Sequence, residues 1–478
     1  MRPELQGQFA EHLGHGIYDG IWVGEGSSIP NIHGYRKDVV EALKAIKVPV
    51  IRWPGGCFAD TYHWRDGIGP QDRRPVRVNT NWGGVEEPNS FGAHEFMNFA
   101  ELVGAKAYLS ANVGSGSPQE ASDWLEYLTS DSRSSLASER RANGRDKAWR
   151  VDYVGVGNEA WGCGGNMRPG AYADLYRRYS AFLRSSGATP IVKVASGANA
   201  DDLAWTDTLM AQAGDLIDAI SLHFYTIPTG QWAHKGSATE FGEAEWIATL
   251  KATLKMDRLI RDHSAVMDKY DPGRRVGLSV DEWGVWLDAE PGSNGAFLYQ
   301  QNSLRDAVTA AINLDIFQAH ADRVRMANIA QMVNVLQAMI LTDHEKMVRT
   351  PTYYAFDLYQ VFQGAVALPV DVAAPDYRFG ADSIPGLYAS AGRDVAGAVD
   401  VALVNPDPSH PVHAEIRLAG LTAHAVRGRI LTAPAMNAVN TFDRPDVVKP
   451  ADFNGAVLKG DVLSVVLPAK AIVVLTLK

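Results

Sequence analysis

The sequence predicts an α/β protein: a (β/α)8 TIM barrel followed by an antiparallel, jelly-roll-like β-sandwich as a C-terminal domain. Over roughly the first three quarters of the chain, short apolar segments rich in β-branched residues alternate with segments of helical periodicity. Eight strand–helix units can be counted, which is the number that a closed barrel requires. After Gly364 the segments are strand-like and are separated by Pro, Gly, Asn and Asp, with no long helix.

The elements follow in chain order. The barrel strands are expected at residues 16–23, 48–53, 105–112, 153–158, 191–196, 219–223, 276–281 and 324–331. Helices are expected at residues 36–46, 91–102, 118–128, 169–185, 203–213, 244–269, 299–319 and 351–362. Strands of the sandwich are expected at residues 398–404, 412–418, 425–431, 456–458, 462–467 and 471–478. We place the catalytic barrel in residues 1–370 and the sandwich domain in residues 371–478.

Bulk composition excludes several classes of protein. The chain has 478 residues and a formal net charge of −10, so a nucleic-acid partner is not expected. No apolar run is long enough to cross a bilayer, and the first residues lack the apolar core of a secretory signal. We therefore expect a cytoplasmic protein with no membrane partner. Its two cysteines, Cys57 and Cys163, are then expected to be reduced thiols rather than a disulfide.

Two glutamates stand where the chemistry of a barrel is expected. Active sites of such barrels lie at the C-terminal ends of the strands. Glu159 directly follows the fourth predicted strand and Glu282 follows the seventh, each with an aromatic residue close behind. Glycoside hydrolysis needs one carboxyl group to protonate the leaving oxygen and a second, ionised one at the anomeric carbon. A single glutamate at a strand end is more often a salt-bridge partner, but two at separate strand ends favour a catalytic pair.

Neighbouring polar residues fit a sugar pocket. Asp281 precedes Glu282, and strand alternation predicts that the two side chains point to opposite faces, with Asp281 as support. His223 ends the sixth predicted strand, Tyr225 follows it, and Gln331 ends the eighth. The loop at residues 52–67 has a Gly-Gly step and several aromatic residues that suit the apolar faces of sugar rings. No HExxH, Cys/His cluster, calcium loop or dinucleotide motif is present, so no metal and no cofactor is expected.

These motifs resemble those of the α-L-arabinofuranosidases of glycoside hydrolase family 51. The resemblance is carried by residues 52–67, 157–161, 221–225 and 281–286, with further matches at residues 11–14, 328–334 and 350–356. It spans nearly the whole chain. It implies the barrel and sandwich architecture, a carbohydrate substrate and a retaining double-displacement mechanism.

The resemblance also implies a role for each matching residue. Glu159 would be the acid/base, Glu282 the nucleophile, and Asn158 a hydrogen-bond partner of the sugar 2-hydroxyl. Glu11, Tyr225 and Gln331 would line the pocket for the terminal arabinofuranose, with Trp82 and Trp286 at its rim. The resemblance further implies a homo-oligomer, commonly a hexamer.

The chain departs from the family pattern at two places. Many relatives carry Asn, whose amide contacts the sugar, where this chain has Cys57. A thiol is a weaker hydrogen-bonding group than an amide, so Cys57 is expected to contact the substrate in an altered form. The segment beginning at Glu11 also comes earlier than in relatives, which usually have one more β-strand before it. Two alternatives to arabinofuranosidase activity remain open at this point: β-xylosidase or endo-β-glucanase action with the same glutamates, or a non-catalytic sugar-binding protein.

Overall fold

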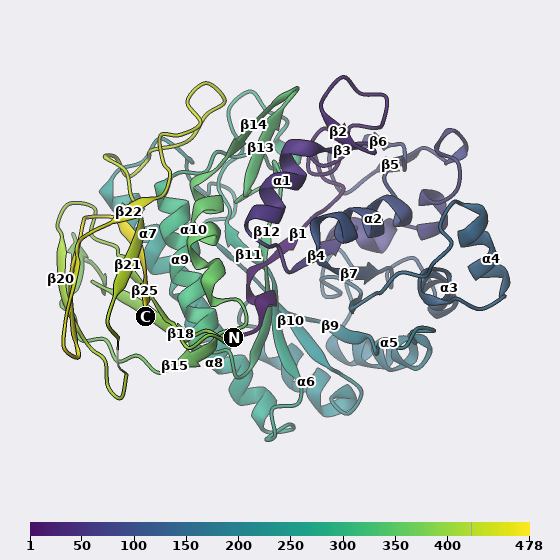
Figure 1. Ribbon diagram of the computed structural model, residues 1–478. Helices are drawn as coiled ribbons and strands as arrows, with labels where there is room; N and C mark the ends of the chain where they lie inside the picture. Colours follow the sequence, from purple (N-terminus) through teal and green to yellow (C-terminus); the bar gives the residue numbers. More distant parts are fainter. Residues whose placement is uncertain (422) are drawn as a thin grey trace.

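The computed structural model describes residues 1–421 and 423–478, and its larger part is a closed barrel of eight parallel strands (Figure 1). Around the barrel the strands follow the order β1-β12-β11-β10-β9-β8-β7-β4, so each strand pairs with its sequence neighbour in the barrel. The predicted fold class is confirmed. The barrel strands are β1 (Gly7–Phe9), β4 (Val50–Trp53), β7 (Lys106–Ala111), β8 (Tyr153–Val156), β9 (Val192–Asn199), β10 (Ala219–Thr226), β11 (Gly277–Val285) and β12 (Val324–Ala330).

The first barrel strand lies earlier in the chain than predicted. Residues 16–23 form turns and isolated bridges, whereas β1 pairs with β4 on one side and β12 on the other. The prediction was wrong because β1 has only three residues, too few to show a periodic pattern. Ile17 and Ile21 are buried as the packed side of a loop. The other seven predicted strands overlap observed ones.

Helices surround the barrel, and three of them, α4, α7 and α8, differ from the prediction. The segment predicted at residues 244–269 is two helices, α7 (Glu243–Thr253) and α8 (Lys255–Asp268). Thr249 and Thr253 donate side-chain hydrogen bonds to the carbonyls four residues earlier, a pattern that bends helices. α4 (Ser135–Ala142) was missed in a serine-rich stretch. The remaining helices are α1 (Lys37–Ala45), α2 (Ala93–Val103), α3 (Pro118–Thr129), α5 (Pro169–Phe182), α6 (Leu203–Ala213), α9 (Leu304–Ala319) and α10 (Pro351–Tyr359). Within the described residues, no helix is long and apolar enough to span a membrane.

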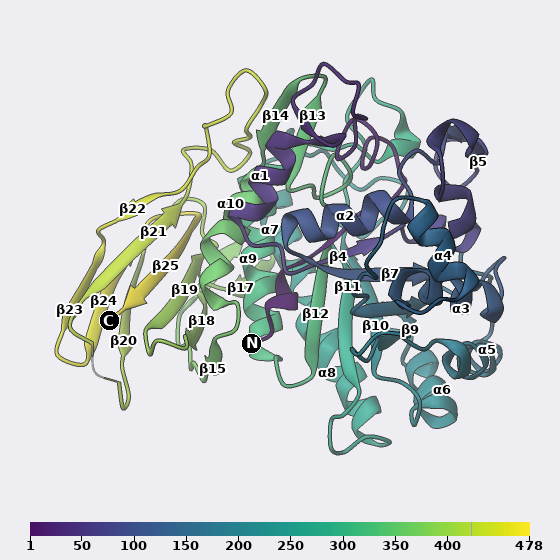
Figure 2. The ribbon, with the colours of Figure 1, turned by 45° about the vertical axis from the view of Figure 1, so that its right-hand side comes forward.

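The C-terminal part is antiparallel and lies beside α9 and α10 (Figure 2). One sheet has the order β15-β18-β19-β25-β21-β22 and a second has the order β20-β24-β23. The six predicted strands are present, and β15, β16, β17, β18 and β22 were not predicted. The bounds are β15 (Val366–Leu368), β16 (Asp376–Phe379), β17 (Asp382–Pro385), β18 (Tyr388–Arg393), β19 (Val399–Asn405), β20 (Val412–Arg417), β21 (Val426–Leu431), β22 (Ala451–Phe453), β23 (Ala456–Lys459), β24 (Val462–Leu467) and β25 (Ala471–Leu477).

The central strands of the larger sheet, β19 and β25, are buried on both faces. Val401 and Leu403 of β19 pack toward the second sheet, whereas Ala402 and Val404 belong to the hydrophobic core shared with the barrel. This explains why β19 and β25 are apolar at nearly every position rather than at alternate ones. The sandwich is therefore fixed to the barrel by a continuous core. A division at residues 370 and 371 stays a prediction.

A buried carboxyl group also joins the two parts. Asp315 of α9 accepts hydrogen bonds from the Ser390 hydroxyl of β18 (2.5 Å) and from the Tyr359 hydroxyl of α10 (2.9 Å). Burial raises the pKa of Asp315 from 3.8 to about 7. The folded state therefore favours the neutral acid, and the stability that Asp315 contributes is lost as the pH rises from about 4 through 7.

We predict that Asp315→Asn removes this pH dependence. The variant should match the wild type in free energy of unfolding at pH 5 and exceed it by roughly 2–4 kcal/mol at pH 8.5. Urea unfolding at both pH values measures the difference, with Asp371→Asn, at an exposed position, as the control. An equal effect of Asp315→Asn at both pH values would contradict this.

Candidate active site

A pocket of about 520 Å³ opens at the C-terminal ends of the barrel strands. Every residue that the sequence predicted for the site lines it, namely Glu11, Cys57, Trp82, Asn158, Glu159, His223, Tyr225, Glu282, Trp286 and Gln331. They come from strands and loops that are far apart in the sequence. The barrel thus brings them together as expected, while their individual roles stay predictions.

Arg52, a residue of β4, is the central cation of the site. Its guanidinium donates to Glu282 Oε1 (2.8 Å) and to Asn158 Oδ1 (2.5 Å), and its Nε lies 3.8 Å from Asp281 Oδ2. The Phe9 ring packs against it at 4.4 Å. Arg52 is fully buried, so it holds these side chains in one orientation without competition from water.

His223 bridges the two predicted catalytic glutamates. Its Nδ1 lies 2.9 Å from Glu159 Oε1 and 3.5 Å from Glu282 Oε2, while Nε2 lies 3.0 Å from Asp281 Oδ1. Burial alone would lower the pKa of His223, but the charge of Glu282 and the bonds to Asp281 and Glu159 raise it to about 10. The ring is therefore an imidazolium at neutral pH, and both nitrogens donate hydrogen bonds to carboxylates.

The direction of the Asp281 side chain differs from the prediction. Asp281 and Glu282 do not point to opposite faces, because both contact Arg52 and His223 inside the barrel. The register of β11 against β12 shifts between Val280 and Trp283, and such a bulge breaks the strict alternation of side chains. Asp281 also accepts a hydrogen bond from the Tyr108 hydroxyl (2.7 Å). Although burial opposes it, the charges of Arg52 and His223 keep the pKa of Asp281 low.

The backbone at the end of β8 turns sharply to present Glu159. Glu159 has a φ of +41°, which L-residues with a side chain seldom adopt. Gly157 has a φ of +79°, and a Cβ there would lie 2.4 Å from Val113 Cγ2. A carboxylate oxygen of Glu159, one of Glu282 and a ring nitrogen of His223 all lie within 4.8 Å of one another. A separation of at most 4.8 Å between these two oxygens agrees with the about 5–5.5 Å between the carboxyl groups of a retaining pair.

The pocket floor on the other side is built around Glu11. Its Oε1 accepts from the backbone N–H groups of Gly56 and Phe58 and from Trp82 Nε1, while Oε2 accepts from Gln331 Nε2. Burial and the charge of Glu282 raise the pKa of Glu11 to about 7. Tyr225 donates its hydroxyl hydrogen bond to Glu282 Oε2 (2.8 Å), and its ring meets Trp286 edge-on at 4.9 Å.

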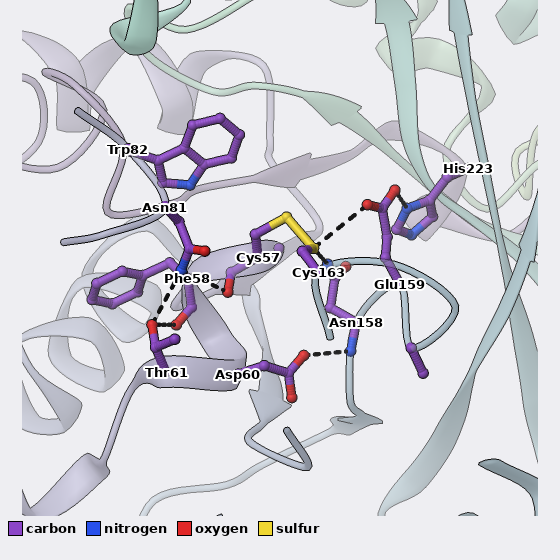
Figure 3. The surroundings of a disulfide bond; sticks show 12 residues. Cys57, Phe58, Asp60, Thr61, Asn81, Trp82, Asn158, Glu159, Cys163 and His223 are labelled. Atoms are coloured by element: carbon purple, nitrogen blue, oxygen red, sulfur yellow. Dashed lines mark hydrogen bonds and ion pairs between the residues drawn. A yellow bond between two sulfur atoms is a disulfide. The ribbon is translucent and has the colours of Figure 1, made fainter. Parts of the chain in front are cut away.

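Cys57 and Cys163 form a disulfide, so the expectation of two reduced thiols was wrong (Figure 3). The prediction rested on the expected compartment and not on geometry. The turn after β4 and the loop after β8 bring the two Cα atoms to 5.5 Å, which is within disulfide range. The bridge lies beside the predicted acid/base, with Cys163 Sγ 3.7 Å from Glu159 Oε2.

Asp60 is a buried residue of the site that the sequence analysis missed. It lies with Cys57 in the short helix η2 (Cys57–Thr61). Its Oδ1 accepts from the N–H groups of Val113 and Gly114 (2.8 Å each), and its Oδ2 accepts from Asn158 N (3.1 Å). The carboxylate therefore ties the ends of β7 and β8 together just before Glu159. No motif marks this role, although Asp60 stands in the aromatic loop that was singled out.

Within the described residues, two groups of three side chains lie as close together as the ligands of a metal ion do. In the first, Cys57, Glu159 and Cys163, the sulfurs are bonded to each other. In the second, Glu159, His223 and Glu282, the histidine is cationic and both of its nitrogens already face carboxylates. Neither donor set fits a metal ion, because a ligating histidine must offer a lone pair.

The fold and the paired carboxylates define a retaining glycoside hydrolase. Comparison with known proteins gives the particular family. An α-L-arabinofuranosidase C-terminal domain model matches residues 281–471, and an α-L-arabinofuranosidase 1 domain model matches residues 42–244. A relative from Bacteroides ovatus, named an intracellular exo-α-L-arabinofuranosidase, is 50% identical over 99% of this chain and 92% of its own. The chain belongs to the α-L-arabinofuranosidases of glycoside hydrolase family 51.

Solved structures agree with this membership. The family 51 arabinofuranosidase from Xanthomonas axonopodis pv. citri has a TM-score of 0.99 and 57% identity, covering 100% of this chain and 97% of that one. The α-L-arabinofuranosidase from Thermotoga maritima, solved as an arabinose complex, has a TM-score of 0.86 and 32% identity, covering 99% and 96%. The resemblance drawn from the sequence is confirmed. The β-xylosidase, endo-β-glucanase and sugar-binding alternatives are not favoured.

We predict that the bridge between Cys57 and Cys163 accounts for both cysteines of the chain. Protein purified in air and denatured without reductant should therefore show no free thiol in a colorimetric titration, and two after reduction. Two thiols before reduction would contradict the bridge.

We predict that Asp60→Asn lowers kcat/KM, which reports the first displacement, by roughly 10–100-fold on poor leaving groups, because the amide NH2 of the variant would face the backbone N–H of Asn158, which in the wild type has a carboxylate acceptor. An aryl arabinofuranoside with a very good leaving group should be much less affected, since its first step needs little help from Glu159. Thermal unfolding of the variant checks that the barrel is intact. An equal loss on both substrates would count against a role in positioning Glu159.

Proposed function

We propose that Glu282 is the nucleophile and Glu159 the acid/base in the release of terminal α-L-arabinofuranosyl residues from arabinose-containing oligo- or polysaccharides. The observation that carries this proposal is the pair of carboxylates within 4.8 Å in one pocket. The membership of the family supports the sugar and the retaining outcome, and the surroundings of each glutamate support its role.

The two glutamates differ in their hydrogen bonds. Glu282 receives a donor on each oxygen, Arg52 on Oε1 and the Tyr225 hydroxyl on Oε2, and its side chain is 8% exposed. Such a carboxylate is fixed in direction, as a nucleophile requires. Glu159 is 20% exposed and receives His223 on Oε1, while Oε2 lies 3.7 Å from Cys163 Sγ, a sulfur that has no proton to donate in the disulfide. That oxygen can hold the proton that a leaving group or a water exchanges.

The reaction then runs in two displacements. In the first, Glu282 forms a bond to the anomeric carbon while the glycosidic bond breaks, and the proton of Glu159 passes to the leaving oxygen. In the second, Glu159 takes a proton from water as that water attacks the anomeric carbon and the bond to Glu282 breaks. Two inversions at the same carbon give net retention.

Charge balance in the site suits this cycle. With the proton on Glu159, the carboxylates of Asp281 and Glu282 face two cations, Arg52 and His223. His223 cannot act as a base because it is already an imidazolium. It instead donates to Glu159 Oε1, which favours the carboxylate that forms when Glu159 gives up its proton.

The rest of the pocket supports recognition of a furanose at the chain end. Glu11 and Asn158 both line the pocket, and Arg52 holds Asn158. In the proposed complex Glu11 accepts hydrogen bonds from sugar hydroxyls and Asn158 bonds the 2-hydroxyl. Trp82 and Trp286 supply apolar surface at the sides. With Cys57 in the bridge, its sulfur offers bulk rather than a thiol donor, so the polar contacts to the sugar fall to Glu11, Asn158 and Gln331.

We predict opposite stereochemistry for azide products of the two glutamate variants. Glu282→Ala should lose at least about 10⁴-fold in hydrolysis, and azide should then give the inverted β-azide. Glu159→Ala should lose roughly 10²–10⁴-fold on poor leaving groups, and azide should give the retained α-azide.

Proton NMR of the products distinguishes these outcomes, and Glu41→Ala, at an exposed position on α1, serves as the control that keeps full activity. If the two variants gave the opposite azide products, the roles of Glu159 and Glu282 would be exchanged. Full activity in Glu282→Ala would contradict its role as the nucleophile.

Two further proposals concern the cellular location and the oligomeric state of the protein. A cytoplasmic location is supported by the name of the Bacteroides ovatus relative, and the Cys57–Cys163 bridge argues against it, because disulfides persist in oxidising compartments. Alkylation of thiols in intact cells, followed by peptide mapping, tests the location. A homo-oligomer, a hexamer in the form the family resemblance suggests, is tested by light scattering of the purified protein.

A further inference from the structure

A second cavity, of about 330 Å³, lies at the opposite end of the barrel from the active-site pocket. This basal cavity opens where β8, β9, β10, β11 and β12 begin, whereas the active-site pocket opens where the strands end. Its inner wall is apolar, because Val194, Ala219 and Met326 belong to a buried cluster at this end of the barrel. The volume lies within the range of small-molecule sites, so the basal cavity can hold the apolar part of a small ligand.

The mouth of the basal cavity carries an excess of positive charge. Arg2, Arg275 and Arg325 line it, and Asp218 is the one carboxylate among the described residues that do so. Three guanidinium groups therefore face one carboxylate. Burial and the charges of Arg2 and Arg323 lower the pKa of Arg325, which indicates that the cations crowd one another.

The acidic residues nearby are paired with other arginines. Arg323, which does not line the basal cavity, is paired with Asp271 (3.0 Å). Arg274 is paired with Asp268 (2.9 Å). Within the part of the chain that the structure describes, none of the three lining arginines forms an ion pair with a carboxylate. Their charge is therefore available to an anion from solution.

Backbone carbonyls hold two of these arginines in fixed positions. Arg275 donates to the carbonyls of Ile217 (2.7 Å) and Gly214 (2.6 Å). Arg325 donates through one terminal nitrogen to the carbonyl of Arg274 (2.7 Å). Neutral carbonyls orient a guanidinium without cancelling its charge, so both cations are preorganised for a further, anionic partner.

A bulge in the barrel directs Arg325 toward the basal cavity. Val324 and Met326 both pair with β11, and the shift of register between them leaves Arg325 as the extra residue. A Cβ on Gly277 would lie only 2.6 Å from Arg325 Cδ. The lack of a side chain at Gly277 therefore lets Arg325 lie across the start of β11.

A buried hydroxyl without a partner lines the same space. Ser279 is 1% exposed, and its Oγ has no hydrogen-bond partner among the described residues. The Tyr153 hydroxyl, which also belongs to the lining, donates instead to Glu4 Oε1 (3.1 Å). An unpaired buried hydroxyl is unfavourable, so the Ser279 hydroxyl indicates a ligand oxygen that accepts from it.

We propose that the basal cavity is a binding site for a small organic anion, namely a carboxylate with an apolar body. The carboxylate pairs with Arg325 and Arg275 and accepts a hydrogen bond from Ser279, while the apolar body packs against the inner wall. Guanidinium groups match the planar geometry of a carboxylate, and the wall excludes a purely polar ligand. The inference does not depend on the roles of Glu159 and Glu282, which lie at the other end of the barrel.

The experiment measures binding of hexanoate to the full chain by isothermal titration calorimetry at constant ionic strength. Acetate and inorganic phosphate carry the charge without the apolar body, and 1-hexanol carries the apolar body without the charge. We expect hexanoate to bind with a Kd of about 1 mM or lower. Each of the other three probes should bind at least about 10-fold more weakly, because each lacks one of the two contacts.

Charge variants locate the binding. Arg325→Gln and Arg275→Gln should each weaken hexanoate binding by about 10-fold, the size of one lost charged hydrogen bond. Arg417→Gln, at an exposed position on β20, makes the same change of charge and should bind hexanoate as the wild type does. All three variants should hydrolyse an aryl arabinofuranoside at the wild-type rate, and thermal unfolding checks that each is folded.

The proposal would be overturned if hexanoate did not bind, or if phosphate, acetate or hexanol bound as tightly as hexanoate. Unchanged affinity in the folded arginine variants would also overturn it, and having two of them keeps the test decisive if one does not fold. Competitive inhibition of hydrolysis by hexanoate would place the binding in the active-site pocket instead and would equally count against a basal site.

Discussion

The geometry of the site depends on one buried cation, the guanidinium of Arg52. It comes from β4 and holds Asn158, at the end of β8, and Glu282, in β11, so it joins three strands on different sides of the barrel. A buried charge is costly unless it is paired and hydrogen-bonded. Arg52 is paired with Glu282 and Asp281, and the same contacts fix Asn158 next to Glu159. The interactions that stabilise the Arg52 cation are therefore the same ones that orient Asn158 and Glu282.

Much of the site could be predicted because the chemistry lies where strands end. Glu159 comes shortly after β8 and Glu282 lies in the C-terminal half of β11, and a parallel barrel brings these strand ends to one face. Asp281 could not be placed, because the bulge in β11 changes which way a side chain points and leaves no mark in the sequence. β1 was missed since three residues show no periodicity. The predicted fold class was still correct, because the first strand–helix unit was counted although its strand was placed too late in the chain.

The disulfide and Asp60 show a second limit of prediction from the sequence, which concerns contacts between distant residues. Both belong to η2, and both reach the loop after β8 from across the barrel mouth, Cys57 by a covalent bond and Asp60 by a hydrogen bond to Asn158 N. Contacts between residues 106 positions apart follow from the tertiary fold and not from local pattern. An argument from compartment favoured free thiols, while the 5.5 Å between Cα atoms decides for the bridge.

These two attachments act differently on Glu159. The disulfide limits how far the loop after β8 can move from the turn after β4, but it leaves torsions around Cys163 free. Asp60 fixes the backbone at Asn158 itself, next to the strained φ of Glu159. A strained conformation persists only when its surroundings hold it, and the hydrogen bond acts one residue away whereas the bridge acts four residues away. Asp60 therefore acts on the direction of Glu159, the proposed acid/base, and the bridge forms part of the pocket wall beside it.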